Sequence, residues 1–400
     1  MKTFTGNFTQ QEGIPDSAIN KAIEVMRSGR LHRYNVAIGE KAEATQLELE
    51  FAQYQGSTFC LACASGGYAM QLALASIGLD HNEPVLTNAF TLSPVPGAIH
   101  NVGAKSVLVE TTDQLVIDLD DLDKKIRSSG ARVLLLSHMR GHIVDMEKLC
   151  DLLEARSVLL IEDCAHTMGA SWNGRLSGTF GLAACFSSQT YKHINSGEGG
   201  FITTDDPDLM ARAVVRSGSY MLYEHHEAAP SQDTYTEIRL DNPNCSGRMD
   251  NLRAAILRPQ LGLLDSNCKR WNERYRVLEQ TLSTSTEITL THRKDSEKYV
   301  GSSIQFFLNS MSSTQIEAVI AECRARGVEL KWFGAEKPTG YTSRHNSWRY
   351  MEQQDLSKTD QILSKLLDMR IPLTFSVADC QLIGEIITEA VAVASKTKVE

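Results

Sequence analysis

Short apolar runs alternate with amphipathic segments through the first half of the chain. Strand-like runs lie at 58–64, 83–89, 104–110, 131–138 and 157–165, and the last three are apolar on both faces. Between them, residues 67–79 place Ala69, Leu72, Leu74 and Ile77 near helical spacing, and 117–129 and 145–156 are amphipathic helices in the same sense. Apolar strands separated by helices predict a mostly parallel α/β sheet covered by helices on both faces.

The pattern changes near residue 262. A long polar helix at 263–282 leads to the run SSIQFFLNSM, a helix at 313–327, the run IPLTFS and a final helix. We therefore predict a large α/β domain over 1–261 and a smaller α+β domain over 262–400, with packing of the N-terminal segment on the small domain as an option. Residues 218–244, rich in Tyr, His, Glu, Asp and Pro, are predicted to form a long surface excursion.

Composition narrows the class of protein. Apolar residues make up 42% and charged residues 22%, and the formal charge of −9 disfavours nucleic acid as a partner. The start of the chain has no apolar signal region, and no window reaches the ~18 apolar residues of a membrane span. We expect a cytoplasmic enzyme or binding protein with no membrane partner.

The chain has nine cysteines, and this odd number does not suggest a disulfide framework. Cys60 and Cys63 form a CxxC, but no second pair follows at zinc-site spacing. We interpret both as strand packing and predict no metal site.

Candidate chemistry gathers where strands end, because ligands of parallel sheets bind at the carboxyl ends of strands. Ser65-Gly66-Gly67 opens a helix and offers backbone N–H groups to an anion, although a Gly-Gly turn is also ordinary. Asp163 ends a buried strand, with Glu162 before it and His166 after it, and it would equally serve as a helix N-cap.

The third strand end carries Lys192, within SSQTYKHINSGEGGF, with Ser187 ahead of it. A loop lysine is commonly a solvated charge, but a buried one becomes a nucleophilic amine. One cofactor, pyridoxal phosphate (PLP), requires a lysine, an acid for its ring nitrogen and an anion cradle.

Four segments resemble the DegT/StrS family of PLP-dependent sugar aminotransferases. They are AIEVMRSGRLHRYN, ASGGYAMQLALASIGL, the block from IEDCAHTMGASWNGRLSGTFG to SGEGGFITTDD, and CSGRMDNLRAAILRPQL. The resemblance covers residues 15–285, with a thinner match beyond. It implies the type I aminotransferase fold, PLP as cofactor and a homodimer whose active sites are shared between subunits.

The resemblance also implies roles for individual residues. Lys192 would bind the cofactor covalently and move protons, Asp163 would pair with the ring nitrogen, and His166 would lie beside the ring hydroxyl. Ser187 and the Ser65-Gly66-Gly67 backbone would hold the phosphate. Lys192 also separates the chain from related sugar dehydratases, which carry histidine at this position.

Three positions depart from the family pattern. Leu92 stands where an aromatic residue usually stacks on the ring, and Phe90 compensates only if its loop shifts. Gly67 replaces a threonine of the phosphate site. Ser246, on the segment that reaches the neighbouring subunit's site, replaces an asparagine.

The predicted reaction is amino transfer from an amino acid, most often L-glutamate in the family, to a keto- or aldehyde-sugar. Arg33, Tyr34, Arg140 and Arg248 are candidate substrate contacts, with surface or salt-bridge roles as the alternative. Two arginines in one cleft would favour an anionic acceptor, either a nucleotide-linked sugar or a sugar acid. The family's 8-amino-3,8-dideoxy-manno-octulosonate transaminases, which serve lipopolysaccharide synthesis, are one named candidate.

Other functions stay open at this point. Dehydration, carbon–carbon bond formation and a catalytically silent regulator all suit the fold. A nicotinamide oxidoreductase is disfavoured because the first strand–helix turn lacks GxGxxG.

Overall fold

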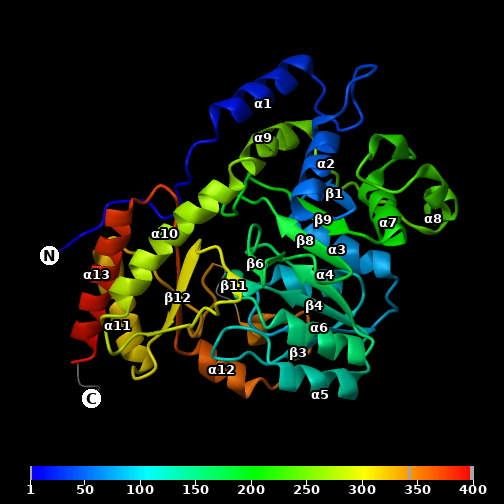
Figure 1. The fold of residues 1–400 in the computed structure, drawn as a ribbon. Coiled ribbons are helices and arrows are strands. Elements are labelled where there is room, and N and C mark those ends of the chain that lie inside the picture. The colour runs from blue at the N-terminus through cyan, green and yellow to red at the C-terminus, as the bar shows by residue number, and fades with distance from the viewer. Residues whose placement is uncertain (1, 341–343, 397–400) are drawn as a thin grey trace.

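A computed structural model describes residues 2–340 and 344–396. Two sheets, each with its own helices, lie side by side (Figure 1). The helices are α1 Asp16–Ser28, α2 Glu43–Gln55, α3 Gly66–Ile77, α4 Pro94–Asn101, α5 Leu119–Ser129, α6 Met146–Ala155, α7 Pro207–Gly218, α8 Tyr235–Asp241, α9 Asn251–Leu261, α10 Leu264–Leu282, α11 Ser313–Ala325, α12 Ser357–Leu363 and α13 Val377–Ala394.

The large sheet has seven strands in the order β1-β9-β8-β5-β4-β2-β3. They are β1 Phe59–Cys63, β2 Pro84–Asn88, β3 Lys105–Val109, β4 Val133–Ser137, β5 Leu159–Asp163, β8 Ala183–Ser187 and β9 Gly200–Thr204. Only β9 runs against its neighbours, and the other paired strands of this sheet are parallel. The mostly parallel α/β sheet is confirmed.

Helices cover both faces of the large sheet. Side chains of α2, α5, α6 and α9 form one apolar cluster, and those of α3, α4 and α7 form the other. Successive strand residues divide between the two clusters, so Cys60 packs on one face and Cys63 on the other. Both thiols are free and buried, as expected for strand packing.

Local sequence sets the ends of these helices. The Asp118 side chain accepts from the amides of Asp120 and Asp121 at the start of α5, and Gly130 ends the helix in the left-handed region. Ser312 and Ser376 open α11 and α13 with reciprocal capping boxes. Such caps satisfy amides that have no partner within the helix.

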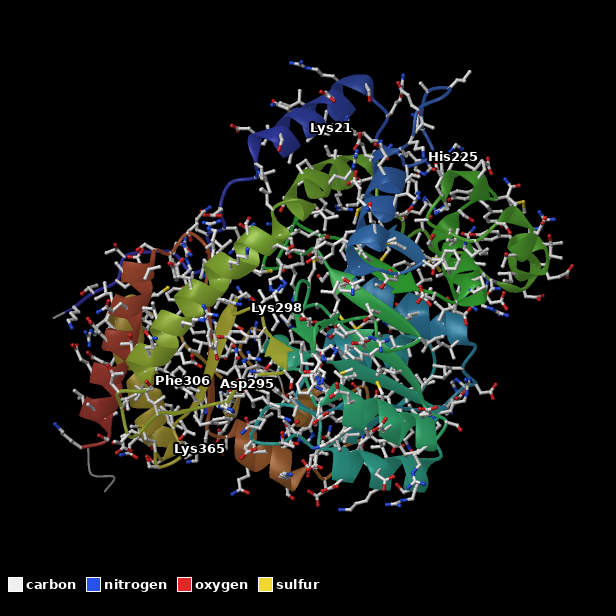
Figure 2. The ribbon with its side chains drawn as sticks, viewed as in Figure 1. Lys21, His225, Asp295, Lys298, Phe306 and Lys365 are labelled. Atoms are coloured by element: carbon white, nitrogen blue, oxygen red, sulfur yellow. The ribbon has the colours of Figure 1, made fainter. Side chains whose placement is uncertain are left out.

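The small sheet has four strands in the order β10-β12-β14-β13, with α10, α11 and α13 packed on it. Its strands are β10 Thr289–Leu290, β12 Ser303–Phe307, β13 Lys331–Trp332 and β14 Leu366–Arg370. Phe306 lies at its centre, between the helices at the left of Figure 2. The predicted division at residue 261 falls between α9 and α10, and whether the two parts fold separately stays a prediction.

Contacts of several kinds join the two parts. Phe4 and Phe8 of the N-terminal segment pack into the core of the small sheet. The short strand β11 Glu297–Lys298 pairs with β6 Ser171–Trp172, which in turn pairs with β7 Arg175–Leu176. The segment before α12 packs on the edge of the large sheet, where Leu356 contacts Ala89 and Leu108.

The prediction that residues 218–244 form a surface excursion is only partly right. They contain α8 and bury Tyr223 and Tyr235, whose rings stack 4.1 Å apart. The segment therefore packs partly against the body of the protein, near α7 (Figure 1).

Candidate active site

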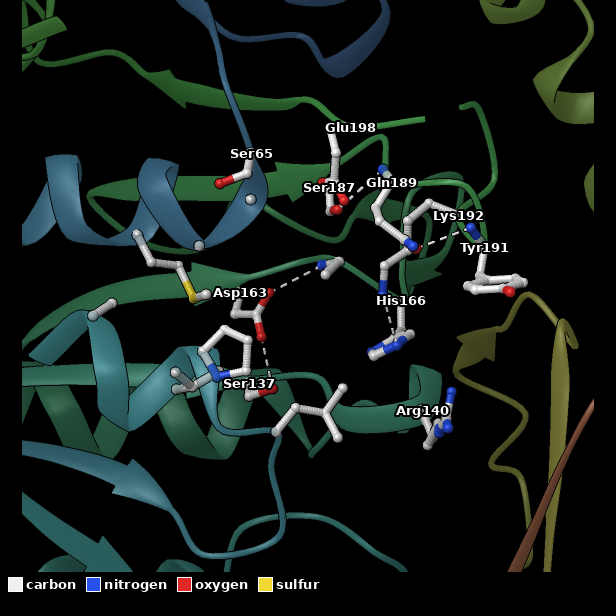
Figure 3. A pocket seen from close by; sticks show the side chains of 18 of the residues that line it. Ser65, Ser137, Arg140, Asp163, His166, Ser187, Gln189, Tyr191, Lys192 and Glu198 are labelled. Atoms are coloured by element: carbon white, nitrogen blue, oxygen red, sulfur yellow. Dashed lines mark hydrogen bonds between the residues drawn. The ribbon is translucent and has the colours of Figure 1, made fainter. Parts of the chain in front are cut away.

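A cavity of about 710 Å³ opens where β4, β5 and β8 end. The first turn of α3 and the small sheet complete its walls. Figure 3 shows the side chains that point into it, among them Asp163, His166, Arg140 and Lys192. The three strand ends singled out in the sequence thus meet in one place.

Asp163 supplies a buried negative charge at the end of β5. One carboxylate oxygen accepts from the Ser137 hydroxyl at 2.8 Å and the other from the Ala165 amide at 3.1 Å. Residues 165–169 form turns rather than a helix, so the Ala165 contact closes a turn, and the helix N-cap considered from the sequence is wrong. Because each carboxylate oxygen accepts more than one hydrogen bond, Asp163 keeps capacity to hold a cation inside the cavity.

Lys192 supplies the amine. Its Nζ lies 2.9 Å from Nε2 of His166. Burial, followed by the charge of Arg140, lowers the pKa of Lys192 to about 7. Burial and Lys192 hold the pKa of His166 well below its usual range. A neutral amine beside a neutral imidazole is chemically a nucleophile with a hydrogen-bond partner.

The start of α3 forms an anion cradle. Ser65 is its N-cap and accepts from the Tyr68 amide at 3.1 Å. A Cβ on Gly66 would lie 2.8 Å from Cβ of Ser187, so glycine lets the helix end lie against β8. The N–H groups, the helix dipole and the Ser187 hydroxyl fit a phosphate.

Two arginines enter the same cavity. Arg140, in a turn after β4, donates to Asp368 at 2.7 Å. Arg370, two residues along β14 from Asp368, lies with its guanidinium carbon 3.8 Å from the centre of the Tyr191 ring. Of the four substrate candidates from the sequence, only Arg140 lines this cavity.

The other three candidates and Ser246 lie elsewhere in this chain. Arg33 is fully buried and donates twice to Glu48, at 2.7 and 2.8 Å, because a buried guanidinium needs a carboxylate. The Tyr34 hydroxyl lies 2.7 Å from His226. Arg248 donates to the Gly218 carbonyl at 2.6 Å and to the Ser246 hydroxyl at 3.3 Å. For Arg33, a structural ion pair replaces the predicted substrate contact.

Leu92 lines the cavity, and that this aliphatic side chain covers the cofactor ring stays a prediction. Phe90 offers no replacement, since it is buried edge-on against Phe333 with ring centres 5.1 Å apart.

Sequence reasoning missed several lining residues, most of which come from distant segments. They are Gln11 of the N-terminal segment, Tyr191, Trp271 of α10, Ser302 and Arg370. Tyr191 adjoins Lys192 and was within reach of the sequence. The others depend on how the small sheet meets the large one, which no local pattern reports.

One possible metal-binding group occurs in the part of the chain that the structure describes: His138, Glu162 and Cys164. The two Glu162 oxygens already accept from three backbone amides of residues 178–181 and approach His138 at 3.0 Å. The Cys164 thiol lies 3.4 Å from the Ser177 hydroxyl, and burial raises the pKa of this thiol well above its usual range. This group is therefore a structural hydrogen-bond cluster.

Known proteins share both sequence and fold with this chain. The model of the DegT/DnrJ/EryC1/StrS aminotransferase family matches residues 14–388. The dTDP-3-amino-3,4,6-trideoxy-alpha-D-glucose transaminase of Micromonospora megalomicea subsp. nigra is 33% identical over 58% of this chain and 59% of its own length. The chain thus matches about three fifths of this relative.

GDP-perosamine synthase of Caulobacter vibrioides is 29% identical over 72% of this chain and 74% of its own length. Among solved structures, 3-amino-5-hydroxybenzoic acid synthase superposes with a TM-score of 0.82 at 22% identity, over 97% of this chain and 99% of that one. The family match and the shared type I fold both run along nearly the whole length, and the chain belongs to the DegT/DnrJ/EryC1/StrS family of PLP-dependent aminotransferases.

Proposed function

We propose that this aminotransferase moves an amino group from an amino acid, with L-glutamate as the expected donor, to the carbonyl carbon of a keto- or aldehyde-sugar. The observation that carries the proposal is the cavity that joins Lys192, beside His166, to Asp163 and to the anion cradle of α3. The two relatives described above are named for nucleotide-linked amino sugars.

Bound PLP would act as the temporary carrier of the amino group. The first turn of α3 and Ser187 would hold its phosphate, and the Asp163 carboxylate would keep its ring nitrogen protonated. His166 would lie beside the ring hydroxyl and Leu92 would cover the ring face by dispersion.

Lys192 would be the group that moves protons during transfer. Proton transfer by Lys192 requires the neutral amine near neutral pH. Burial and the charge of Arg140 favour this neutral form because they lower the pKa of Lys192 to about 7. His166 holds Nζ from one side, so the amine is aimed into the cavity rather than toward solvent.

An anionic acceptor suits the cavity. Arg140 and Arg370 place two guanidinium groups on its wall, with Asp368 as the carboxylate paired to Arg140. A nucleotide-linked sugar and a sugar acid both satisfy this charge. We expect an amino sugar for a cell-surface polysaccharide, a lipopolysaccharide or a secondary metabolite as the product, with 8-amino-3,8-dideoxy-manno-octulosonate retained as a candidate.

We infer a homodimer with shared active sites, because some of the predicted site residues lie outside the cavity of their own chain. Ser246 and Arg248 lie outside it, and Tyr220 and Met221 beside them expose 57% and 64% of their surface. In a dimer such apolar side chains are covered and Ser246 reaches the other subunit's phosphate.

We also propose a cytoplasmic location, which suits nine free cysteines. Among residues 2–340 and 344–396, no helix has both the length and the apolar character to cross a membrane.

The test is a coupled assay of the PLP-loaded enzyme with L-glutamate and a panel of nucleotide-linked keto-sugars and oxidised sugar acids. We expect 2-oxoglutarate to form beyond one equivalent per enzyme site only when a suitable acceptor is present, and Lys192→Met to abolish its formation. If the sugar loses water and no 2-oxoglutarate forms, the enzyme is a dehydratase rather than an aminotransferase. Absence of a borohydride-fixed pyridoxyl label on Lys192 would overturn the proposal itself.

A further inference from the structure

A buried polar chain links the small sheet to the cavity wall at Arg140. Asp368 of β14 accepts from Arg140 through one oxygen and from the Gln305 side-chain amide through the other, both at 2.7 Å. The Gln305 oxygen in turn lies 2.8 Å from Nε2 of His142. All four side chains are less than 8% exposed, and we call Gln305, Asp368 and His142 the relay.

Each hydrogen bond in the relay has only one possible direction. The Asp368 carboxylate only accepts, so Gln305 must turn its NH₂ group toward it. The Gln305 oxygen then faces His142, which must donate from Nε2. Burial and the charge of Arg293 hold the pKa of His142 well below its usual range, so the ring is neutral and carries that single proton.

Strand pairing fixes the relay on the small sheet. Gln305 of β12 stands directly opposite Asp368 of β14, and Ser303 opposite Arg370. Gln305 also donates to the Ser303 hydroxyl at 2.9 Å. Gln305 and Asp368 are therefore attached to the small sheet at two strands, whereas Arg140 and His142 belong to the turn after β4.

That turn depends on support from outside itself. Arg140 and Gly141 both have positive φ, 56° and 76°, which is an unfavourable conformation for an arginine. A guanidinium nitrogen of Arg293 donates to the Gly141 carbonyl at 2.8 Å, and a Cβ on Gly141 would lie 3.1 Å from the His166 carbonyl. The backbone of Arg140 is thus held from one side and its guanidinium from the other.

We propose that Asp368, Gln305 and His142 are positioning residues for Arg140, which hold its guanidinium in the cavity through the small sheet. The inference rests on the proposed function only in taking Arg140 as a working part of the site. In consequence, the charge on the cavity wall is in place only while the small sheet is seated against the turn after β4.

The test is a double-mutant cycle between Gln305→Met and Arg140→Met, because both changes leave the Asp368 charge intact. The readout is the pH midpoint of the visible absorbance of the PLP-loaded enzyme, which follows the proton at the Lys192 nitrogen and needs no substrate. The charged and titratable groups around that nitrogen are Arg140, Asp163, His166, His193 and Arg370. Withdrawal of a nearby positive charge raises the midpoint.

We expect Gln305→Met to raise the midpoint by a measurable fraction of the shift that Arg140→Met causes. In the Arg140→Met background it should add nothing, since relay and arginine act as one unit. Gln55→Met is the matched control, because Gln55 is also a buried glutamine but donates to the Ser177 carbonyl at 2.6 Å.

Three results would overturn the proposal: no shift with Gln305→Met, an equal shift in both backgrounds, or an equal shift with Gln55→Met. The outcome is independent of the acceptor. A failure to transfer amino groups to any sugar would refute the proposed function while the absorbance cycle still decides the role of the relay.

Discussion

At the scale of single residues, the environment of Lys192 makes a prediction about stability. In an unfolded chain a lysine titrates near 10.4, whereas burial lowers the pKa of Lys192 to about 7 in the fold. Between these values the unfolded chain binds the proton and the folded apoprotein does not. The free energy of unfolding therefore rises with pH across this window, and falls as pH drops toward 7.

We expect Lys192→Met to remove this rise. From pH 7 to pH 9 the wild-type apoprotein should gain about 1 kcal/mol more stability than the variant, less than a fully enclosed lysine gives because the side chain faces an open cavity. Urea unfolding at both pH values measures the difference. Lys148→Met, at an exposed site, reports the effect of losing one charge. Parallel pH profiles for wild type and Lys192→Met would show that the lysine keeps an ordinary pKa.

Sequence reasoning located the residues whose neighbours in the chain reveal them. Asp163 ends a recognisable strand, and Lys192 and the Ser65-Gly66-Gly67 turn follow two others, and the sheet brings these strand ends together. Arg33 and Arg248 show the limit, because an arginine in a sequence carries no sign of its partner. Arg33 forms an ion pair with a buried carboxylate, and Arg248 donates a hydrogen bond to a backbone carbonyl.

At the scale of elements, β1 to β5, five of the seven strands of the large sheet, lie within the runs predicted from apolar residues, whereas β8 and β9 lie outside those runs. The sequence did not predict β14, because its residues LLDMR include Asp368 and Arg370. Charged residues are not typical of a buried strand, so the apolar pattern is interrupted there. Asp368 is fully buried and Arg370 is partly buried, and they contact Arg140 and Tyr191 across the junction of the sheets. β14, which the sequence pattern does not predict, is thus the strand that places charged side chains at the cavity.

The close approach of α3 to β8 gives a prediction with a built-in control. Gly66→Ala would place a methyl group 2.8 Å from Cβ of Ser187 and 3.2 Å from the Phe186 carbonyl, whereas the nearest atom to a methyl on Gly67 lies at 3.6 Å. We expect Gly66→Ala to cost about 1–3 kcal/mol in unfolding free energy and to weaken PLP binding. Gly67→Ala should change stability by less than about 0.5 kcal/mol.

Urea unfolding of the apoprotein and fluorescence titration with PLP measure the two effects. Equal losses in both variants would mean that the helix end relaxes as a whole and that contact with β8 does not require glycine.

At the scale of the whole molecule, the cavity lies at a junction between parts that are distant in sequence. Gln11, Trp271 and Arg370 reach it from the N-terminal segment, α10 and β14. The N-terminal segment also binds the small sheet, where the Phe4 amide donates to the Arg326 carbonyl at 2.8 Å. Both Phe4 and Phe8 meet the ring of Phe375 edge-on at 4.9 Å.

This arrangement predicts that the first few residues stabilise a wall of the site. Phe8 is 4% exposed, so Phe8→Ala should cost about 3–4 kcal/mol by leaving a cavity beside Phe375. Phe375 shares the loop after β14 with Ile371 and Pro372, which line the cavity. The variant should therefore lose acceptor affinity as well as stability, although no part of Phe8 reaches the cavity.

Hydrogen exchange separates local from global loosening. We expect Phe8→Ala to raise exchange in β14 and α13 more than in β4 and β5, because the large sheet has its own apolar clusters. Ile38→Ala, at a fully exposed apolar residue, controls for loss of a side chain without a packing partner in the chain. Equal exchange in both sheets would mean that the molecule opens as one unit, and the N-terminal segment would then stabilise the whole fold rather than one wall of its site.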